Sequence, residues 1–120
     1  TVMAEISEND IIMPNELRRR LQNYLNSNTA YNISLEDLSA ALGVSSTYLS
    51  RKFKEWMGTS FSIYMTSRRM EYAKKLLLTT GDSVKSISAK VGYNDSNYFC
   101  RVFKKCMGQS PAYYRSLHLL

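Results

Sequence analysis

Residues 46–64 read STYLSRKFKEWMGTSFSIY, and residues 96–114, fifty positions later, read SNYFCRVFKKCMGQSPAYY. The identical pairs are Ser46/Ser96, Tyr48/Tyr98, Arg51/Arg101, Phe53/Phe103, Lys54/Lys104, Met57/Met107, Gly58/Gly108, Ser60/Ser110 and Tyr64/Tyr114. A shorter match precedes each copy, because Ser39, Ala40 and Gly43 recur as Ser88, Ala89 and Gly92. Two copies of one short unit suggest a ligand that is itself periodic.

From residue 14 onward the chain has the spacing of helices. Apolar residues recur three and four positions apart, and polar caps precede the expected helix starts. The expected first residues or caps are Pro14, Ser34, Ser45, Ser60, Ser83, Asn94 or Asp95, and Ser110. No stretch of useful length alternates as a strand would, so an all-α fold is predicted.

Several side chains are expected in the core. The helix at 60–79 is predicted to bury Ile63, Met70, Ala73 and Leu77, and the two repeated helices to bury Leu49, Phe53, Trp56, Phe99, Val102, Phe103 and Cys106. The small residues Ala40 and Ala89 are expected where helices approach closely. Tyr48 and Tyr98 are interpreted as residues that pack within the protein, rather than as rings that stack on the bases of a nucleic acid.

Positive charge is unevenly placed along the 120 residues. The net charge is +6, but residues 17–120 hold all 16 Lys and Arg and only six acidic residues, a net of +10. Such a field favours a polyanionic partner, although a generic basic surface has the same composition. Duplex DNA is the periodic, anionic ligand that fits both the charge and the repeat.

The composition argues against other classes of function. One histidine, two cysteines six positions apart and no acidic cluster make a zinc site implausible, and no catalytic set can be assembled. We therefore expect no enzyme and no cofactor. No signal peptide or membrane span is visible, and unpaired cysteines fit a reduced cytoplasm.

Each copy has the parts of a helix-turn-helix, in which the second helix enters the major groove. The side chains left outside are Ser46, Thr47, Ser50, Arg51 and Lys54 in the first copy, and Ser96, Asn97, Cys100, Arg101 and Lys104 in the second. Arginine can bind guanine and asparagine can bind adenine. One such face alone is more typical of a solvated helix, but the same Arg and Lys at equivalent positions of both copies reverse that preference in favour of DNA. The helix at 60–79, about 28 Å long, compares with about 34 Å for one DNA turn.

Residues 15–116 resemble the DNA-binding domain of AraC/XylS-type transcription regulators. The most specific match is ISAKVGYNDSNYFCRVFKK at 87–105, followed by GQSP at 108–111 and Tyr114-Arg115. Arg69-Met70, Ala73 and Leu76-Leu77 match the pattern of the linking helix. The resemblance implies seven helices and two helix-turn-helix subdomains joined by one long helix, with a reading helix from each in adjacent major grooves.

Base contacts are predicted for the exposed positions of the reading helices, and phosphate contacts for basic residues and helix starts. The base-contact candidates are Ser46, Thr47, Ser50, Arg51, Ser96, Asn97, Cys100 and Arg101. The phosphate-contact candidates are Lys54, Ser60, Arg68, Arg69, Lys104, Ser110 and Arg115.

The predicted organisation is a linker or tail at 1–14, a first subdomain at 15–80 that includes the 60–79 helix, and a second at 81–120. The predicted function is sequence-specific binding of double-stranded promoter DNA by a bacterial regulator in the cytoplasm. RNA polymerase and an upstream sensing or dimerisation domain are expected partners, and no membrane is. The alternatives are a helical protein-interaction domain and an architectural DNA binder without sequence preference.

Overall fold

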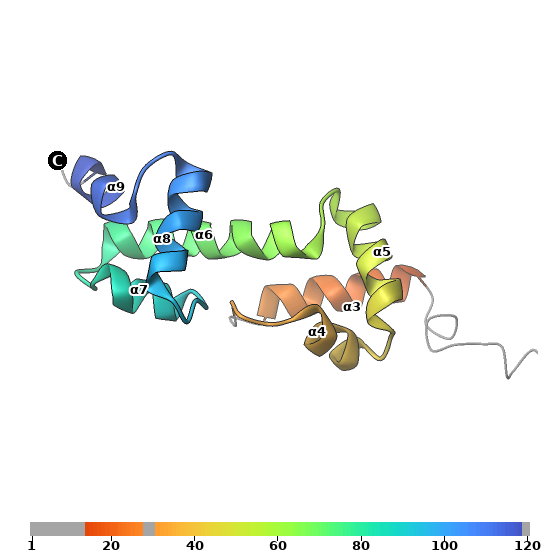
Figure 1. Ribbon diagram of the computed structural model, residues 1–120. Helices are drawn as coiled ribbons and strands as arrows, with labels where there is room; N and C mark the ends of the chain where they lie inside the picture. Colours follow the sequence, from red (N-terminus) through yellow and green to blue (C-terminus); the bar gives the residue numbers. More distant parts are fainter. Residues whose placement is uncertain (1–13, 28–30, 119–120) are drawn as a thin grey trace, which may run out of the picture. The chain divides into compact units, whose positions relative to one another are not determined.

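The computed structural model describes residues 14–27 and 31–118, and all regular structure in these ranges is helical (Figure 1). The helices are α3 (Pro14–Ser27), α4 (Leu35–Leu42), α5 (Ser46–Met57), α6 (Phe61–Thr79), α7 (Val84–Lys90), α8 (Ser96–Met107) and α9 (Pro111–His118). Within the described residues, the predicted all-α fold and its seven helices are confirmed. The predicted tail at 1–14 lies, apart from Pro14, outside the described residues. None of the helices described is long and apolar enough to cross a membrane.

The chain divides into two compact units between Tyr64 and Met65, whereas the sequence prediction set the boundary after residue 80. The difference concerns α6. Its buried residues Met70, Ala73 and Leu77 belong to the core of the second unit, together with residues of α7 and α8. Most of α6 is therefore part of the second unit rather than an appendage of the first.

The core of the first unit joins α3, α4 and α5. Leu17 and Leu21 of α3, Leu38 of α4, and Leu49 and Phe53 of α5 are fully buried in it. The start of α4 is fixed by a capping box, in which the Ser34 hydroxyl accepts from the Asp37 N–H and the Asp37 carboxylate accepts from the Ser34 N–H.

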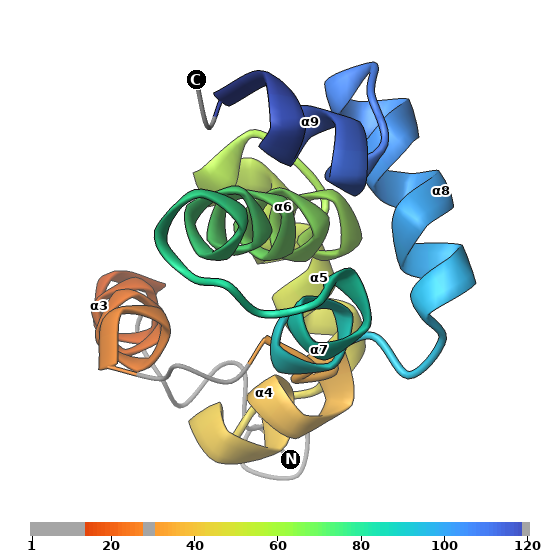
Figure 2. The same cartoon turned by 90° about the vertical axis from the view of Figure 1, so that its left-hand side faces the viewer.

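The second unit repeats this arrangement around the C-terminal part of α6. Figure 2 looks along α6 and shows α7, α8 and α9 packed around it. Ile87 of α7 and Val91, the residue that ends this helix, are buried with Phe99 and Phe103 of α8. Ser83 caps α7 by accepting from the Ser86 N–H at 3.0 Å, as the sequence predicts.

Gly58 and Gly108 occupy equivalent positions of the two repeats and end α5 and α8, the two predicted reading helices, in the same way. Their φ angles are +76° and +79°, in the left-handed region that costs other residues free energy. A side chain at either position would meet nothing within 4 Å. The backbone conformation, not lack of space, is therefore the reason for glycine here.

Four packing predictions, for Ala40, Ala89, Ile63 and Cys106, are wrong for geometric reasons. Ala40 and Ala89 are exposed, and the preceding serines, Ser39 and Ser88, are buried instead. Ser39 lies four residues after Leu35 and three before Leu42, so it shares their inward face, as Ser88 shares that of its own helix. Spacing thus identified the correct helices but assigned the close contact one residue late.

Ile63 and Cys106 have the spacing of core residues but are exposed, Ile63 by 60%. Ile63 lies at the start of α6, where Phe61 and Tyr64 make the ring contacts with Phe53. Cys106 lies in the last turn of α8. Spacing gives the direction of a side chain, but burial also needs a neighbouring element to cover it. Trp56 and Val102 are half-buried at the edges of their cores.

Candidate nucleic-acid interface

The outer face of α5 is a continuous polar stripe. Thr47, Ser50, Arg51 and Lys54 are all exposed, and their spacing of three and four residues places them on one side of the helix. Leu49 and Phe53 lie on the other side of α5, and both are fully buried. The core thus fixes which face of α5 is available to a ligand. Ser46, the first residue of the helix, is half-buried.

The outer face of α8 repeats the stripe with different residues. Asn97, Arg101 and Lys104 are exposed, and Ser96 at the helix start is half-buried. Cys100 differs from the other candidates, because it packs partly against the second core. Burial raises the pKa of the Cys100 thiol, so the group is neutral at pH 7 and is at most a weak hydrogen-bond donor.

The two reading helices begin with different caps. The Ser45 hydroxyl accepts from the Tyr48 N–H at 3.2 Å, whereas Asp95 Oδ1 accepts from the Asn97 and Tyr98 N–H groups at 2.9 and 3.4 Å. Both caps satisfy donors that the helix leaves unpaired. Only Asp95 adds a negative charge, and it does so at the end of α8 that faces a ligand in a helix-turn-helix.

Replacing Asp95 separates its two roles. Asp95→Ala is expected to lower the free energy of unfolding by about 1 kcal/mol, because the cap is lost. Asp95→Ser keeps a capping oxygen and removes the charge, so it should retain stability and tighten binding to duplexes of any sequence. Chemical denaturation and DNA titration check both effects. Weaker binding by the serine variant would mean that the carboxylate contributes an attractive contact.

Ser60 and Ser110, predicted to contact phosphate, cap α6 and α9, the helices that follow α5 and α8. Each hydroxyl accepts from the N–H three residues later, in Ile63 and Tyr113, at 3.2 Å in both copies. The oxygen acts as acceptor in these bonds, so the O–H group can still donate to a phosphate oxygen. The phosphate contact itself stays a prediction.

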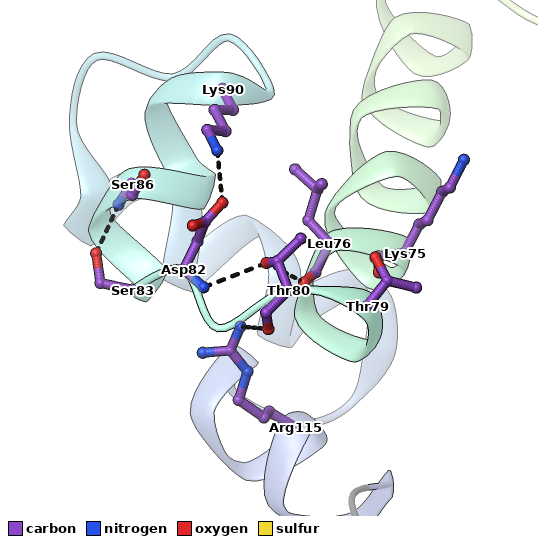
Figure 3. Close-up of polar contacts among 9 residues, drawn as sticks. All are labelled: Lys75, Leu76, Thr79, Thr80, Asp82, Ser83, Ser86, Lys90 and Arg115. Carbon is purple, nitrogen blue, oxygen red and sulfur yellow. Dashed lines mark hydrogen bonds and ion pairs between the residues drawn. The ribbon is translucent and has the colours of Figure 1, made fainter.

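Arg115 has an internal role that the sequence did not reveal. Its Nε donates to the carbonyl of Leu77 at 3.0 Å and its Nη2 to that of Thr80 at 3.1 Å. These carbonyls belong to the last turn of α6 and the residue after it, where helix carbonyls lack partners and a cation is favoured. Figure 3 shows Arg115 reaching this end of α6. Two of its donors are thus used within the protein; its phosphate contact stays a prediction for the remaining ones.

A second polar contact lies beside it in Figure 3, between Asp82 and Lys90. The hydrogen bond from the Lys90 ammonium lowers the pKa of the Asp82 carboxyl, and the same bond raises the pKa of Lys90. Both groups therefore stay ionised at pH 7. The ion pair neutralises Lys90, so this lysine adds less to the positive field of the second unit than the sequence alone suggests.

Three of the candidate arginines lie over tyrosine rings. The guanidinium carbons of Arg51 and Arg101 are 5.6 and 5.7 Å from the ring centroids of Tyr48 and Tyr98, three residues earlier. Arg69 lies 5.2 Å from the centroid of Tyr93. Arg68 and Arg69 are both half-buried on α6. Sequence reasoning assigned Tyr48 and Tyr98 to packing and missed their contacts with Arg51 and Arg101, although the repeated Tyr-x-x-Arg spacing was a usable signal.

Within residues 14–27 and 31–118, no group of three or more His, Cys, Asp or Glu side chains could hold a metal ion. The side chains that converge on the outer faces of α5 and α8 are hydrogen-bonding and cationic groups. With two short helices and a turn in each unit, they define a domain with two helix-turn-helix motifs.

Comparison with known proteins supports the assignment of helix-turn-helix motifs. A family described as a helix-turn-helix domain matches residues 38–116. The raffinose operon transcriptional regulatory protein RafR of Pediococcus pentosaceus is 41% identical over 92 residues, 77% of this chain and 33% of RafR. The chain thus spans about a third of the length of that relative.

Solved structures show the same fold. The C-terminal domain of the two-component response regulator yesN from Fusobacterium nucleatum has a TM-score of 0.74 at 41% identity, covering 82% of this chain and 96% of that domain. The DNA-binding domain of AdpA, solved in complex with a target DNA, has a TM-score of 0.74 at 23% identity, covering 85% and 91%. This chain belongs to the AraC-type family of helix-turn-helix transcription regulators, and it corresponds to their DNA-binding domain.

Proposed function

We propose that this chain binds promoter DNA with α5 in one major groove and α8 in the next groove on the same face of the duplex. The observation that carries the proposal is the matched pair of outer faces. Each presents an exposed arginine and an exposed lysine three residues later, above a buried phenylalanine. The length of α6, 19 residues or about 28 Å, is compatible with one turn of DNA at about 34 Å.

The outer faces also differ, and the differences predict the form of the site. Thr47 and Ser50 of α5 stand where α8 has Asn97 and Cys100. Arg51 and Arg101 are suited to guanine, and Asn97 to adenine. The short side chains Ser46, Ser96, Thr47 and Ser50 can add single hydrogen bonds to nearby bases. The proposed site is therefore bipartite and non-palindromic, with different bases in its two halves.

Selection of bound sequences from a random duplex pool tests this proposal. Two separated, unlike half-sites about one helical turn apart are expected. A single half-site one groove long would contradict the use of both units. If the chain binds duplexes but no preferred sequence is recovered, the result would favour an architectural binder. If the chain binds no duplex at all, the result would favour the protein-interaction alternative.

Replacing the arginines tests the residue roles. Arg51→Ala and Arg101→Ala should each weaken binding to the selected site by about 1–3 kcal/mol and relax the preference at one base position, in different halves. Lys105→Ala, which removes an exposed charge from α8 at a position off the reading stripe, is the matched control. Unchanged base preference in both arginine variants would show that the selectivity comes from other side chains.

The proposal has consequences for partners and location. Because relatives such as RafR are about three times longer than the matched region, a sensing or dimerisation domain in the same regulator is proposed. A regulator that activates a promoter must also act on RNA polymerase, which we propose as a second partner. Binding to the bacterial chromosome implies action in the cytoplasm.

A further inference from the structure

Four side chains of the second unit form a continuous line of contacts. Arg69 of α6 lies over the ring of Tyr93, at 5.2 Å. The Tyr93 and Tyr98 rings are 6.0 Å apart between centroids and tilted by 52°. Arg101 lies over the ring of Tyr98, at 5.7 Å. Two aromatic rings thus stand between an arginine proposed to contact phosphate and one proposed to contact a base.

One end of this line is anchored in the core. Tyr93 is only 8% exposed, and its ring lies 5.4 Å from that of Phe99, which is fully buried. Tyr98 is 50% exposed and follows the capped start of α8, where Asp95 accepts from its N–H. The core therefore holds Tyr93, and Tyr93 with the helix start holds Tyr98 beside Arg101.

We propose that Tyr98, supported by Tyr93, is a positioning residue that holds the Arg101 guanidinium against α8 before DNA binds. A guanidinium is attracted to the face of an aromatic ring, and long side chains lose rotamer freedom when they are fixed. Fixing Arg101 in the free protein removes part of that loss from the binding step. The inference rests on the proposed contact of Arg101 with a base.

The first unit contains the same pair in a different setting. Arg51 lies 5.6 Å from the centroid of Tyr48, although the residue equivalent to Tyr93 is Val44, which provides no ring. Tyr48 is also approached by Lys52, at 5.8 Å. The Tyr–Arg contact thus occurs on both reading helices despite different surroundings. This links it to the reading face rather than to the packing of one core.

The free protein provides a test that does not depend on DNA. Tyr98→Leu should increase the mobility of the Arg101 side chain, seen as a lower ¹⁵Nε order parameter, whereas Tyr98→Phe should retain the wild-type value. Tyr113→Leu, at a tyrosine 54% exposed on α9, is the control for loss of an exposed ring. Thermal unfolding checks that each variant is folded. An unchanged Arg101 order parameter in folded Tyr98→Leu would overturn the proposal.

Binding to the selected duplex provides the second test. Tyr98→Leu should weaken binding by about two- to five-fold in the wild-type background and have no further effect when combined with Arg101→Ala. An equal loss in both backgrounds would overturn the positioning role, and so would an equal loss in Tyr98→Phe, which would assign the effect to the hydroxyl. If wild-type protein binds no duplex, the proposed function fails, and the Arg101 order parameter alone decides the positioning role.

Discussion

Raising the monovalent salt concentration from about 50 to 200 mM is expected to weaken DNA binding by about 10³- to 10⁴-fold. The chain has basic side chains on the outer faces of α5 and α8, on α6 and on α9. These are enough for roughly 6–8 phosphate contacts. Each contact releases a counterion, so the slope of log K against log salt should be about −5 to −7. Fluorescence anisotropy with a labelled duplex, repeated across the salt range, measures this slope.

Two variants calibrate that experiment. Lys54 and Lys104 are exposed at equivalent positions of α5 and α8. Lys54→Ala and Lys104→Ala should each make the slope about one unit less negative and weaken binding to selected and random duplexes alike. A slope near zero for the wild-type protein would contradict DNA as the principal ligand and would favour the protein-interaction alternative.

Replacing Arg115 by alanine is expected to lower the free energy of unfolding of the second unit by about 1.5–3 kcal/mol. The variant loses two hydrogen bonds from a cation to the carbonyls of Leu77 and Thr80, and it leaves those partly buried carbonyls without these donors. Native-state hydrogen exchange in α6, α8 and α9 can measure this loss within the second unit, with the amides of α4 and α5 as an internal reference.

Comparison with Lys104→Ala separates a structural role for Arg115 from a phosphate contact. Arg115→Lys keeps the charge but cannot reproduce two bonds from one planar fork, so part of the stability should be lost. If Arg115→Ala left hydrogen exchange unchanged and only reduced the salt slope by about one unit, as is expected of Lys104→Ala, Arg115 would be a phosphate contact and its internal bonds would contribute nothing.

The asymmetry between the two reading helices bears on how a single chain recognises DNA. Asp95 gives α8 an anionic cap, and the Tyr93 ring contacts Tyr98, whereas the equivalent residue of the first unit, Val44, provides no ring beside Tyr48. We therefore expect α8 to discriminate more strongly between bases than α5. The bipartite site from the selection experiment should show this as a sharper preference in one half.

Short-range sequence patterns were sufficient to predict much of the fold. The repeated Ser, Phe and Gly positions predicted the starts, buried faces and ends of α5 and α8, because caps, a 3.6-residue period and left-handed glycines act within a few residues of chain. The same reasoning identified the two outer stripes, which consist of Thr47, Ser50, Arg51 and Lys54 on α5 and of Asn97, Cys100, Arg101 and Lys104 on α8. These are exposed in the structure apart from Cys100, which is partly buried.

Contacts between distant elements could not be predicted in that way. Ile63 has the spacing of a core residue but no covering neighbour, α6 packs mostly with the second unit, and Arg115 bonds to carbonyls 35 and 38 residues earlier. The sequence by itself determined the helices, their inner faces and the duplicated basic stripes, since these depend on local spacing. Only the tertiary structure decided which neighbour covers each face and which arginines are already engaged, because burial and long-range hydrogen bonds depend on packing between segments far apart in the chain.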